Sequence, residues 1–353
     1  MVPPRKALDV AVLDATTPVP IIDVHAHMRP GAGPRRGAGP GGAVSGGFDD
    51  AAQFAANEMK RYDVVASIIL PPPNVEGRGA EANAYAQAVA PYEGLYVAAG
   101  GGSLNPMIER AHSTGEMGPQ IAGPFRQLAE RFSHSGIVAL GEFASVHLSM
   151  FNGHPYEDTP PDHPLFMMLA DIAAENDLPI DLHMEVIPQD MDMPKGWHQR
   201  SSANPETIKG NVDNLERLLA HNANARVVWA HVGWDNTGYW TVDLTRRLLA
   251  AHANLFLSIK LNPNAAAPEN RPVAGNGSIK PEWLALFREF PDRFVIGTDA
   301  FYNAVPNAQR SPDEGTLDQA RRFVDALPDD LKRKIAYANA VRIYRLDRSH
   351  GGA

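Results

Sequence analysis

Short apolar segments rich in β-branched residues alternate along the chain with segments whose apolar residues recur at three- and four-residue steps. The first pattern is typical of buried strands in a parallel sheet, and the second of amphipathic helices. The helical segments include residues 52–62, 80–90, 164–176, 212–222 and 243–252. The eight predicted strands lie at residues 20–27, 64–70, 95–101, 136–143, 178–184, 226–232, 255–261 and 293–300.

Eight strand–helix units predict an α/β fold, and specifically a (β/α)8 TIM barrel formed as a single domain by residues 21–346. Residues 1–20 form an N-terminal extension in this interpretation, and residues 347–353 form a C-terminal tail. A doubly wound open sheet is the alternative. Such a sheet usually contains fewer strands and carries nucleotide-binding glycines, so we favour the barrel.

Three predicted connections are long and rich in Gly, Pro, Asn or Ser, and each follows the carboxyl end of a strand. In a TIM barrel such loops stand on one face, where active sites are built. The first contains Gly37, Gly39 and Gly42 at the spacing of a dinucleotide fingerprint. These glycines neither follow a strand directly nor open a helix, so we interpret them as loop residues. The three connections are residues 28–48, 185–207 and 262–281.

Two histidines, His25 and His27, end the first predicted strand in the segment IIDVHAHMRP. Because side chains alternate along a strand, both face the same side and can grip one ion. Taken alone, such a pair more often hydrogen-bonds to backbone or carboxylate groups. Other predicted strands change this interpretation, because they end with Glu142, His183, His231 and Asp299.

Buried charges and imidazoles are costly unless they are paired or bound to metal, so six such groups at one barrel mouth predict a shared divalent cation. The chain has no cysteine, which excludes disulfides, iron–sulfur clusters, thiolate zinc sites and a cysteine nucleophile. Histidine and carboxylate ligands suit Zn²⁺ best, and Mn²⁺, Fe²⁺ or Ni²⁺ are possible on the same ligands.

Composition and charge limit the kinds of molecule that the protein is expected to bind. The chain is 44% hydrophobic and 21% charged, as in an ordinary globular protein. Its net charge of −9 argues against nucleic acid and anionic membranes, so we expect a small-molecule substrate, and a homodimer as the usual state of such enzymes. No apolar run of transmembrane length or signal-like N-terminus is present, which predicts a cytoplasmic protein. A secreted or periplasmic chain whose signal has been removed is the alternative.

The strand-end segments HAH (25–27), GE (141–142), DLH (181–183), AHVG (230–233) and GTD (297–299) closely resemble the amidohydrolase superfamily. Within it, they resemble the branch of amidohydrolase-related metal-dependent hydrolases. The resemblance extends from residue 21 to about residue 346. Its last part is IAYANAVRIYRL, where Asn339, Ala340 and Arg342 match the N-A-x-R signature of the family's closing helix.

The resemblance implies that each of the six residues is a metal ligand or a catalytic group. His25, His27 and Asp299 would bind one metal ion, and His183 and His231 a second. Glu142 stands where many members have a bridging carboxylated lysine and some have glutamate, which leaves one or two ions open. In members with one ion, His183 joins the first ion, and His231 polarises the substrate or transfers protons.

The implied activity is hydrolysis of an ester, lactone or amide bond in a small molecule by metal-activated water, with Asp299 as the proton acceptor. The alternative is a non-oxidative decarboxylase of a small aromatic carboxylic acid, in which Arg29 or Arg271 holds the carboxylate. A metal-stabilised binding protein without catalysis is least favoured, because the ligand set is complete.

Further residues near the predicted strand ends are candidates for substrate contact. Aromatic residues follow His231 in GWDNTGYW, where Trp234 is the candidate and Tyr239 and Trp240 are alternatives that could equally pack the next helix. We interpret His147, His154, His163 and His198 as surface or loop-capping residues. The predicted substrate-binding residues are Arg29, Trp234, Lys260, Asn262 and Tyr302.

Overall fold

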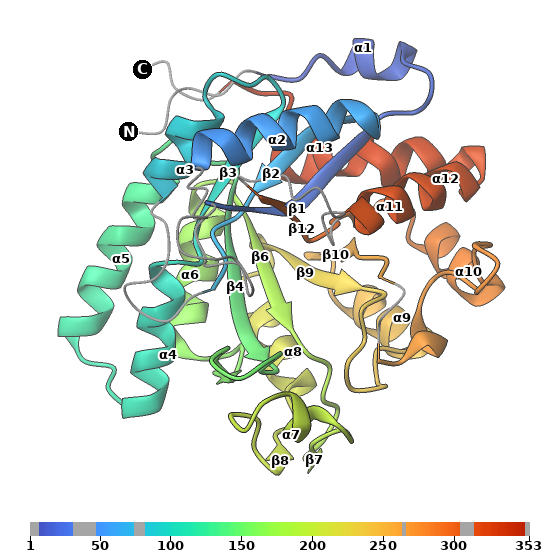
Figure 1. Ribbon diagram of the computed structural model, residues 1–353. Helices are drawn as coiled ribbons and strands as arrows, with labels where there is room; N and C mark the ends of the chain where they lie inside the picture. Colours follow the sequence, from blue (N-terminus) through green and yellow to red (C-terminus); the bar gives the residue numbers. More distant parts are fainter. Residues whose placement is uncertain (1–6, 31–46, 74–81, 263–265, 304–313, 350–353) are drawn as a thin grey trace, which may run out of the picture.

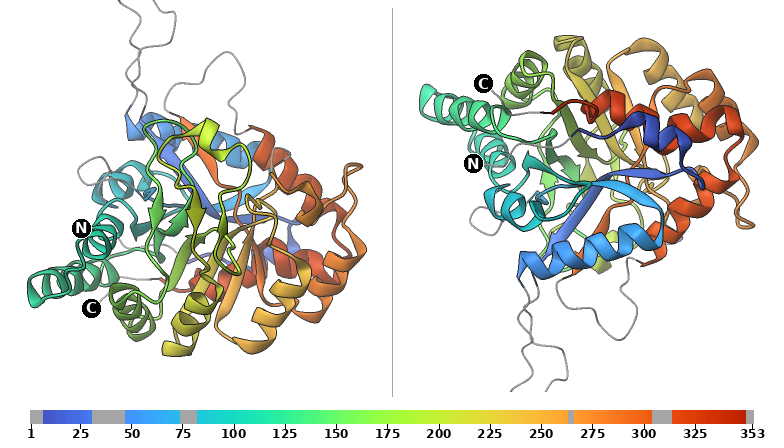
Figure 2. Two further views of the ribbon diagram at one scale, coloured as in Figure 1. Left: turned by 90° about the horizontal axis from the view of Figure 1, so that it is seen from below. Right: turned by 90° about the horizontal axis from the view of Figure 1, so that it is seen from above.

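In the computed structural model, parallel strands close into a barrel that is surrounded by helices (Figures 1 and 2). The structure describes residues 7–30, 47–73, 82–262, 266–303 and 314–349, so Gly37, Gly39 and Gly42, interpreted as loop residues, lie outside it. The barrel strands are β1 (Ile21–Arg29), β2 (Val64–Ile69), β3 (Leu95–Gly100), β4 (Ala139–His147), β6 (Pro179–Met184), β9 (Arg226–Val232), β10 (Leu255–Ile259), β11 (Phe294–Ile296) and β12 (Ala300–Asn303).

Consecutive strands are hydrogen-bonded neighbours, and the barrel closes because β11 and β12 both pair with β1 in parallel. This confirms the predicted (β/α)8 TIM barrel. Most residues of these strands are fully buried, as expected when one face lines the barrel interior and the other packs against helices. Each strand carboxyl end therefore delivers its last side chains to the same mouth.

The eighth predicted strand, residues 293–300, is not continuous. It is divided into β11 and β12 by Gly297, Thr298 and Asp299. The backbone N–H and the hydroxyl of Thr298 donate to the buried carboxylate of Asp23, at 2.9 and 2.6 Å. These bonds replace ladder hydrogen bonds, so the strand breaks where Asp299 must turn towards the barrel axis.

The helices lie outside the barrel and follow one another around it in sequence order (Figure 2, left). The five predicted helical segments are confirmed as α2, α3, α6, α8 and α9, with ends shifted by at most four residues. The helices are α1 (Val10–Ala15), α2 (Phe48–Arg61), α3 (Ala82–Val89), α4 (Leu104–Thr114), α5 (Pro119–Ser133), α6 (Pro164–Glu175), α7 (Trp197–Arg200), α8 (Val212–His221), α9 (Val242–Ala251), α10 (Pro281–Glu289), α11 (Glu314–Ala326), α12 (Asp329–Arg333) and α13 (Asn339–Tyr344), with a 3₁₀ turn η1 (Pro268–Asn270) and a π-helical turn η2 (Lys334–Ala338).

The connections at the strand carboxyl ends contain short elements of their own. The connection after β6 holds the antiparallel pair β7 (Met191–Asp192) and β8 (Thr207–Ile208) together with α7, and these lie at the bottom of Figure 1. The short strand β5 (Glu157–Asp158) returns antiparallel to β4. These additions surround the mouth where the strands end.

The described part of the N-terminal extension packs against the barrel at the opposite end, at the top of Figure 1. Leu13 of α1 is buried, and the backbone N–H of Leu8 donates to the carbonyl of Leu346 at 2.7 Å. Among the described residues, none of the helices is long and apolar enough to cross a lipid bilayer.

Candidate metal centre

His25 and His27 lie inside the barrel, where neighbouring groups set the direction of each ring. The Nδ1 of His25 donates to the carboxylate of Asp181 at 3.1 Å, and the Nδ1 of His27 donates to the carbonyl of Leu70 at 2.8 Å. The two Nε2 atoms, 3.2 Å apart, then face each other. Two ring nitrogens this close require a proton or a cation between them. The pair therefore fits a metal ion bound through both Nε2 atoms, with outer hydrogen bonds that orient the rings.

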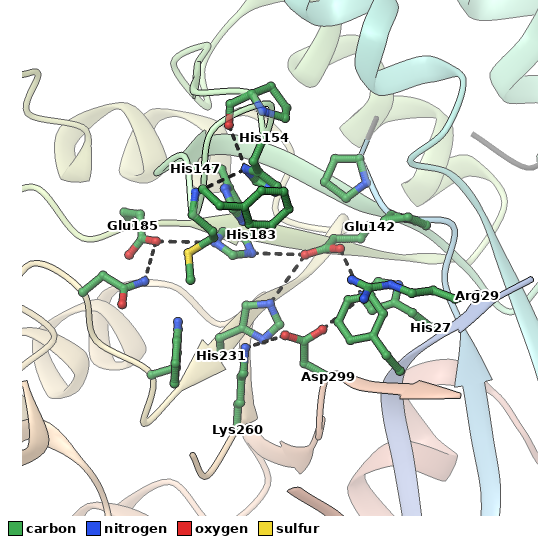
Figure 3. A pocket seen from close by; sticks show the side chains of 18 of the residues that line it. His27, Arg29, Glu142, His147, His154, His183, Glu185, His231, Lys260 and Asp299 are labelled. Carbon is green, nitrogen blue, oxygen red and sulfur yellow. Dashed lines mark hydrogen bonds and ion pairs between the residues drawn. The ribbon is translucent and has the colours of Figure 1, made fainter. Parts of the chain in front are cut away.

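Glu142 lies at the centre of the cluster (Figure 3). Its Oε1 is 3.1 Å from Nδ1 of His183 and 3.5 Å from Nε2 of His231. Its Oε2 is 3.4 Å from Nε2 of His27. One carboxylate oxygen thus faces the histidines of β6 and β9 and lies 3.7 Å from Nε2 of His25, and the other faces His27. This geometry suits either a bridge between two ions or a ligand of one.

Asp299 completes the cluster from the break between β11 and β12. Its Oδ1 is 3.1 Å from Nε2 of His27, while its Oδ2 forms an ion pair with Lys260. The backbone φ angles of Asp299 (55°) and His231 (76°) lie in the left-handed region, which residues other than glycine rarely adopt. Backbone strain of this kind collects at functional sites, where the surrounding structure maintains it.

The ligand atoms of these residues converge in three overlapping triads, each with its atoms within 4.8 Å of one another. Any two triads share a residue, so one ligand could serve two ions. Glu142 belongs to two of the triads and offers two oxygens for that purpose. The triads are His25, His27 and Glu142; His25, His231 and Asp299; and Glu142, His183 and His231.

The charges of the cluster suit a divalent cation. Burial opposes protonation of His25, yet the carboxylates of Asp181 and Glu142 raise its pKa to about 10. Burial likewise opposes protonation of His183, while Glu142 and Glu185 raise its pKa to about 9. The buried carboxylates thus favour positive charge at these two histidines. A divalent cation supplies the same positive charge and releases protons from its ligands.

His231 differs from these two histidines. Burial and then the positive charge of Lys260 hold its pKa well below the usual value, so its imidazole is neutral at pH 7. The neutral form is the one that binds metal or accepts a proton. Its Nδ1 is buried, and it has no hydrogen-bond partner among the described residues.

The comparison with protein families decides the identity. A family model described as Amidohydrolase matches residues 22–346, which includes all six residues of the cluster. The chain belongs to the amidohydrolase family. This confirms the resemblance seen in the strand-end segments. A search of curated proteins gave no match.

Solved structures similar to this amidohydrolase include enzymes of different activities. A probable 2-pyrone-4,6-dicarboxylic acid hydrolase from Acinetobacter baumannii is 12% identical, with a TM-score of 0.47, and the match covers 92% of this chain and 99% of that one. A dihydroxybenzoic acid decarboxylase from a Polaromonas species, with bound manganese, is 13% identical, with a TM-score of 0.45 and coverage of 93% and 98%. An organophosphorus hydrolase variant from Deinococcus radiodurans is 16% identical, with a TM-score of 0.47 and coverage of 93% and 92%.

A cavity of about 580 Å³ opens over the cluster. Five of the six candidate ligands line it, and His25 lies buried beneath them. Around them the wall is largely apolar, so the cavity combines a polar floor with apolar sides, as ligand sites commonly do. The other lining residues are Arg29, Pro72, Pro73, His147, Met150, Phe151, Gly153, His154, Pro155, Glu185, Trp234, Asn236, Lys260 and Phe301.

Three of the predicted substrate-binding residues, Arg29, Trp234 and Lys260, line this cavity. Tyr302 lies outside it, buried in β12 with its ring facing Phe54 of α2 at 6.4 Å between centroids. Because strand side chains alternate, the cavity position expected of Tyr302 belongs to its neighbour Phe301.

Asn262 also lies outside the cavity lining, and its carbonyl accepts a hydrogen bond from Arg271 at 3.2 Å. Strand β10 ends at Ile259. Lys260 follows it directly and is the last side chain there that faces the mouth. Of the aromatic alternatives, Trp240 stacks on Trp229 in the core at 4.4 Å, and Tyr239 is exposed.

Two histidines interpreted as surface residues belong to the cavity instead. The ring of His147 lies 4.2 Å from that of His183, and His154 follows at 4.8 Å from His147. The cause is that β4 continues to His147, four residues beyond its predicted end. His163 does cap α6, because its Nδ1 accepts from the backbone of Leu165 at 3.3 Å. His198 in α7 is exposed.

Two carboxylates were missed entirely. Asp181 orients His25, and Glu185 lies 3.7 Å from Nε2 of His183 while accepting from Asn236 at 2.8 Å. Both stand two residues from His183, on the same face by strand alternation. Their two-residue spacing from His183 is the sequence feature that could have identified them.

Proposed function

We propose that this amidohydrolase is a metal-dependent hydrolase that cleaves an ester, lactone or amide bond of a small molecule. The observation that supports this most is the convergence of four histidines and two carboxylates beneath one cavity. Buried groups of this kind need a common positive partner. The cavity above them gives a substrate access to that partner.

His25, His27 and Asp299 would hold a divalent ion together with Glu142, and His183 and His231 would either hold a second ion or face the substrate. We infer Zn²⁺ as the first choice for this donor set, with Mn²⁺, Fe²⁺ or Ni²⁺ as alternatives. When bound, the ion supplies a water whose pKa falls from 15.7 to about 7.

The chain's own residues supply the proton transfers. Asp299 accepts the proton of the attacking water and passes it to the leaving group, while Lys260 holds its second oxygen. His231, neutral and at the cavity wall, polarises the reacting carbonyl or carries a proton. No covalent intermediate is needed, which agrees with a chain that has no cysteine.

A decarboxylase of a small aromatic acid is the second candidate, and Arg29 is the observation that favours it. Its guanidinium lies 3.8 Å from the centre of the Phe301 ring at the cavity rim. None of the described carboxylates pairs with it, so it remains available to a carboxylate ligand. Arg271, the other arginine considered, does not line the cavity.

Metal content per chain tests the proposal. Protein purified without chelator is analysed by elemental mass spectrometry, for the native chain and for Glu142→Ala, and is then assayed with ester, lactone, amide and aromatic-acid panels. About two equivalents that fall with Glu142→Ala support a bridged hydrolase. About one equivalent that does not change favours His231 as a free catalytic group and gives the decarboxylase equal standing. Absence of metal from active protein would refute both. The same panels test the expected small-molecule substrate, and light scattering tests the expected homodimer.

A further inference from the structure

Lys260 is an unusual residue to find beside a metal centre. It is buried at the carboxyl end of β10, with 8% of its surface exposed. Its ammonium forms an ion pair with Asp299 and lies 4.5 Å from the centre of the Trp234 ring. Figure 3 shows the side chain directed from the cavity wall towards Asp299 and His231. A fixed positive charge therefore stands at the place where a divalent cation is expected.

This charge is unfavourable for metal binding. Like charges a few ångströms apart in a poorly solvated site repel each other strongly. The field of Lys260 already reaches His231, whose pKa it helps to lower. Metal affinity alone would therefore favour an uncharged side chain at this position.

Orientation of Asp299 does not require the lysine either. The backbone N–H of Asp299 donates to the carbonyl of His25 at 2.8 Å, and its Oδ1 faces His27 at 3.1 Å. The backbone and one oxygen are thus held without Lys260. A residue that costs metal affinity and is not needed to place the ligand must contribute to another step.

The hydrogen-bonding capacity of Lys260 shows what it offers. An ammonium has three N–H donors, and Asp299 is its one hydrogen-bond acceptor among the described residues. The face of Trp234 stabilises the charge but leaves the other donors unused. Because Lys260 lines the cavity, those donors are available to a molecule bound there.

We propose that Lys260 binds an anionic oxygen of the substrate next to the metal ion, so that the site selects substrates with a carboxylate beside the reacting group. The inference rests on the proposed metal centre. Apolar side chains around the same cavity, including Met150, Phe151 and Phe301, favour a carboxylate attached to a small apolar or aromatic body.

Two binding measurements on the full-length protein test this. The dissociation constant of Zn²⁺ is measured by chelator competition, and that of benzoate by calorimetry on Zn²⁺-loaded protein, with benzamide as the neutral isostere. In Lys260→Met we expect Zn²⁺ to bind about tenfold more tightly and benzoate about tenfold more weakly, with benzamide unchanged. Lys260→Arg, which keeps the charge, is the matched control and should retain benzoate binding.

The opposite signs are the decisive feature, because damage to the fold weakens both ligands together. Weaker binding of both ligands by Lys260→Met, or benzoate binding equal to that of the native chain, overturns the role of Lys260. A native chain that binds no divalent metal at all overturns the proposed function instead, so the two failures are distinguishable.

Discussion

Two cavities of nearly equal size lie at opposite ends of the barrel, and their walls differ in kind. The cavity at the strand carboxyl ends has a volume of about 580 Å³, and the one between α1, α3 and the start of β3 about 570 Å³. The first is lined by five histidines, three carboxylates, a lysine and an arginine. The second is lined mainly by aliphatic and aromatic side chains, with Asp9 and Glu93 as its acidic residues.

The difference shows that volume does not identify a functional site. Asp9 at the amino end accepts backbone hydrogen bonds from Ala11 at 3.0 Å and so serves as the cap of α1. At the carboxyl end, the carboxylates of Glu142 and Asp299 instead both face the imidazole of His27. Ionisable side chains that converge on one another, and do not all form hydrogen bonds with the backbone, indicate a functional site.

The largest effect is expected at Asp299. Asp299→Asn keeps the size and an oxygen for Lys260 but removes the proton acceptor, so turnover should fall about a thousandfold while the fold and most metal remain. Steady-state kinetics at saturating metal, with metal content measured on the same samples, checks this. Turnover close to that of the native chain would remove Asp299 from the mechanism.

Metal binding is expected to depend on the histidines of β1. The double variant His25→Ala, His27→Ala removes both Nε2 ligands, so metal content should fall to background in elemental analysis. A matched change at the other cavity, Val12→Ala, should leave the metal content of the native chain unchanged. Retention of metal by the double variant would contradict the ligand assignment.

The barrel and the six central residues were predictable because they follow simple periodic rules. Apolar runs separated by amphipathic helices marked each strand, and alternation placed His25 and His27 on one face. The strand-end location of Glu142 and His183 then brought them to the same mouth in any closed barrel. Family membership of residues 22–346 agrees with that pattern.

What escaped prediction depends on local irregularity. Strand β4 pairs with β6 through register shifts and extends to His147, so alternation from Glu142 did not reveal that this histidine lies at the cavity. The strand restarts as β12 after the break, and there Phe301 lines the cavity while Tyr302, the predicted substrate contact, does not. Both errors come from interruptions of the strand period, which tertiary hydrogen bonds create and which periodic reasoning does not detect.

The amino-end cavity should matter for stability alone. Leu13 of α1 is 5% exposed and lines that cavity, so Leu13→Ala should lower the free energy of unfolding by about 2 kcal/mol. Urea unfolding measures this, and metal content on the same protein should not change. A loss of metal in Leu13→Ala would mean that the two ends of the barrel are coupled.

The smallest effect concerns a buried carboxyl at the carboxyl end that lies outside the metal cluster. Burial raises the pKa of Glu157 from 4.5 to about 8, and its Oε1 accepts from Asn105 at 3.1 Å. Between these pH values the folded state holds a proton that the unfolded chain has lost, so the free energy of unfolding decreases as pH rises. Glu157→Gln removes this dependence while keeping an acceptor for Asn105. In urea unfolding with excess chelator, the stability that the variant gains over the native chain should be clearly larger at pH 8 than at pH 5. Equal stability differences at both pH values would show that Glu157 is ionised in the fold, and would place it with the carboxylates that need a cation.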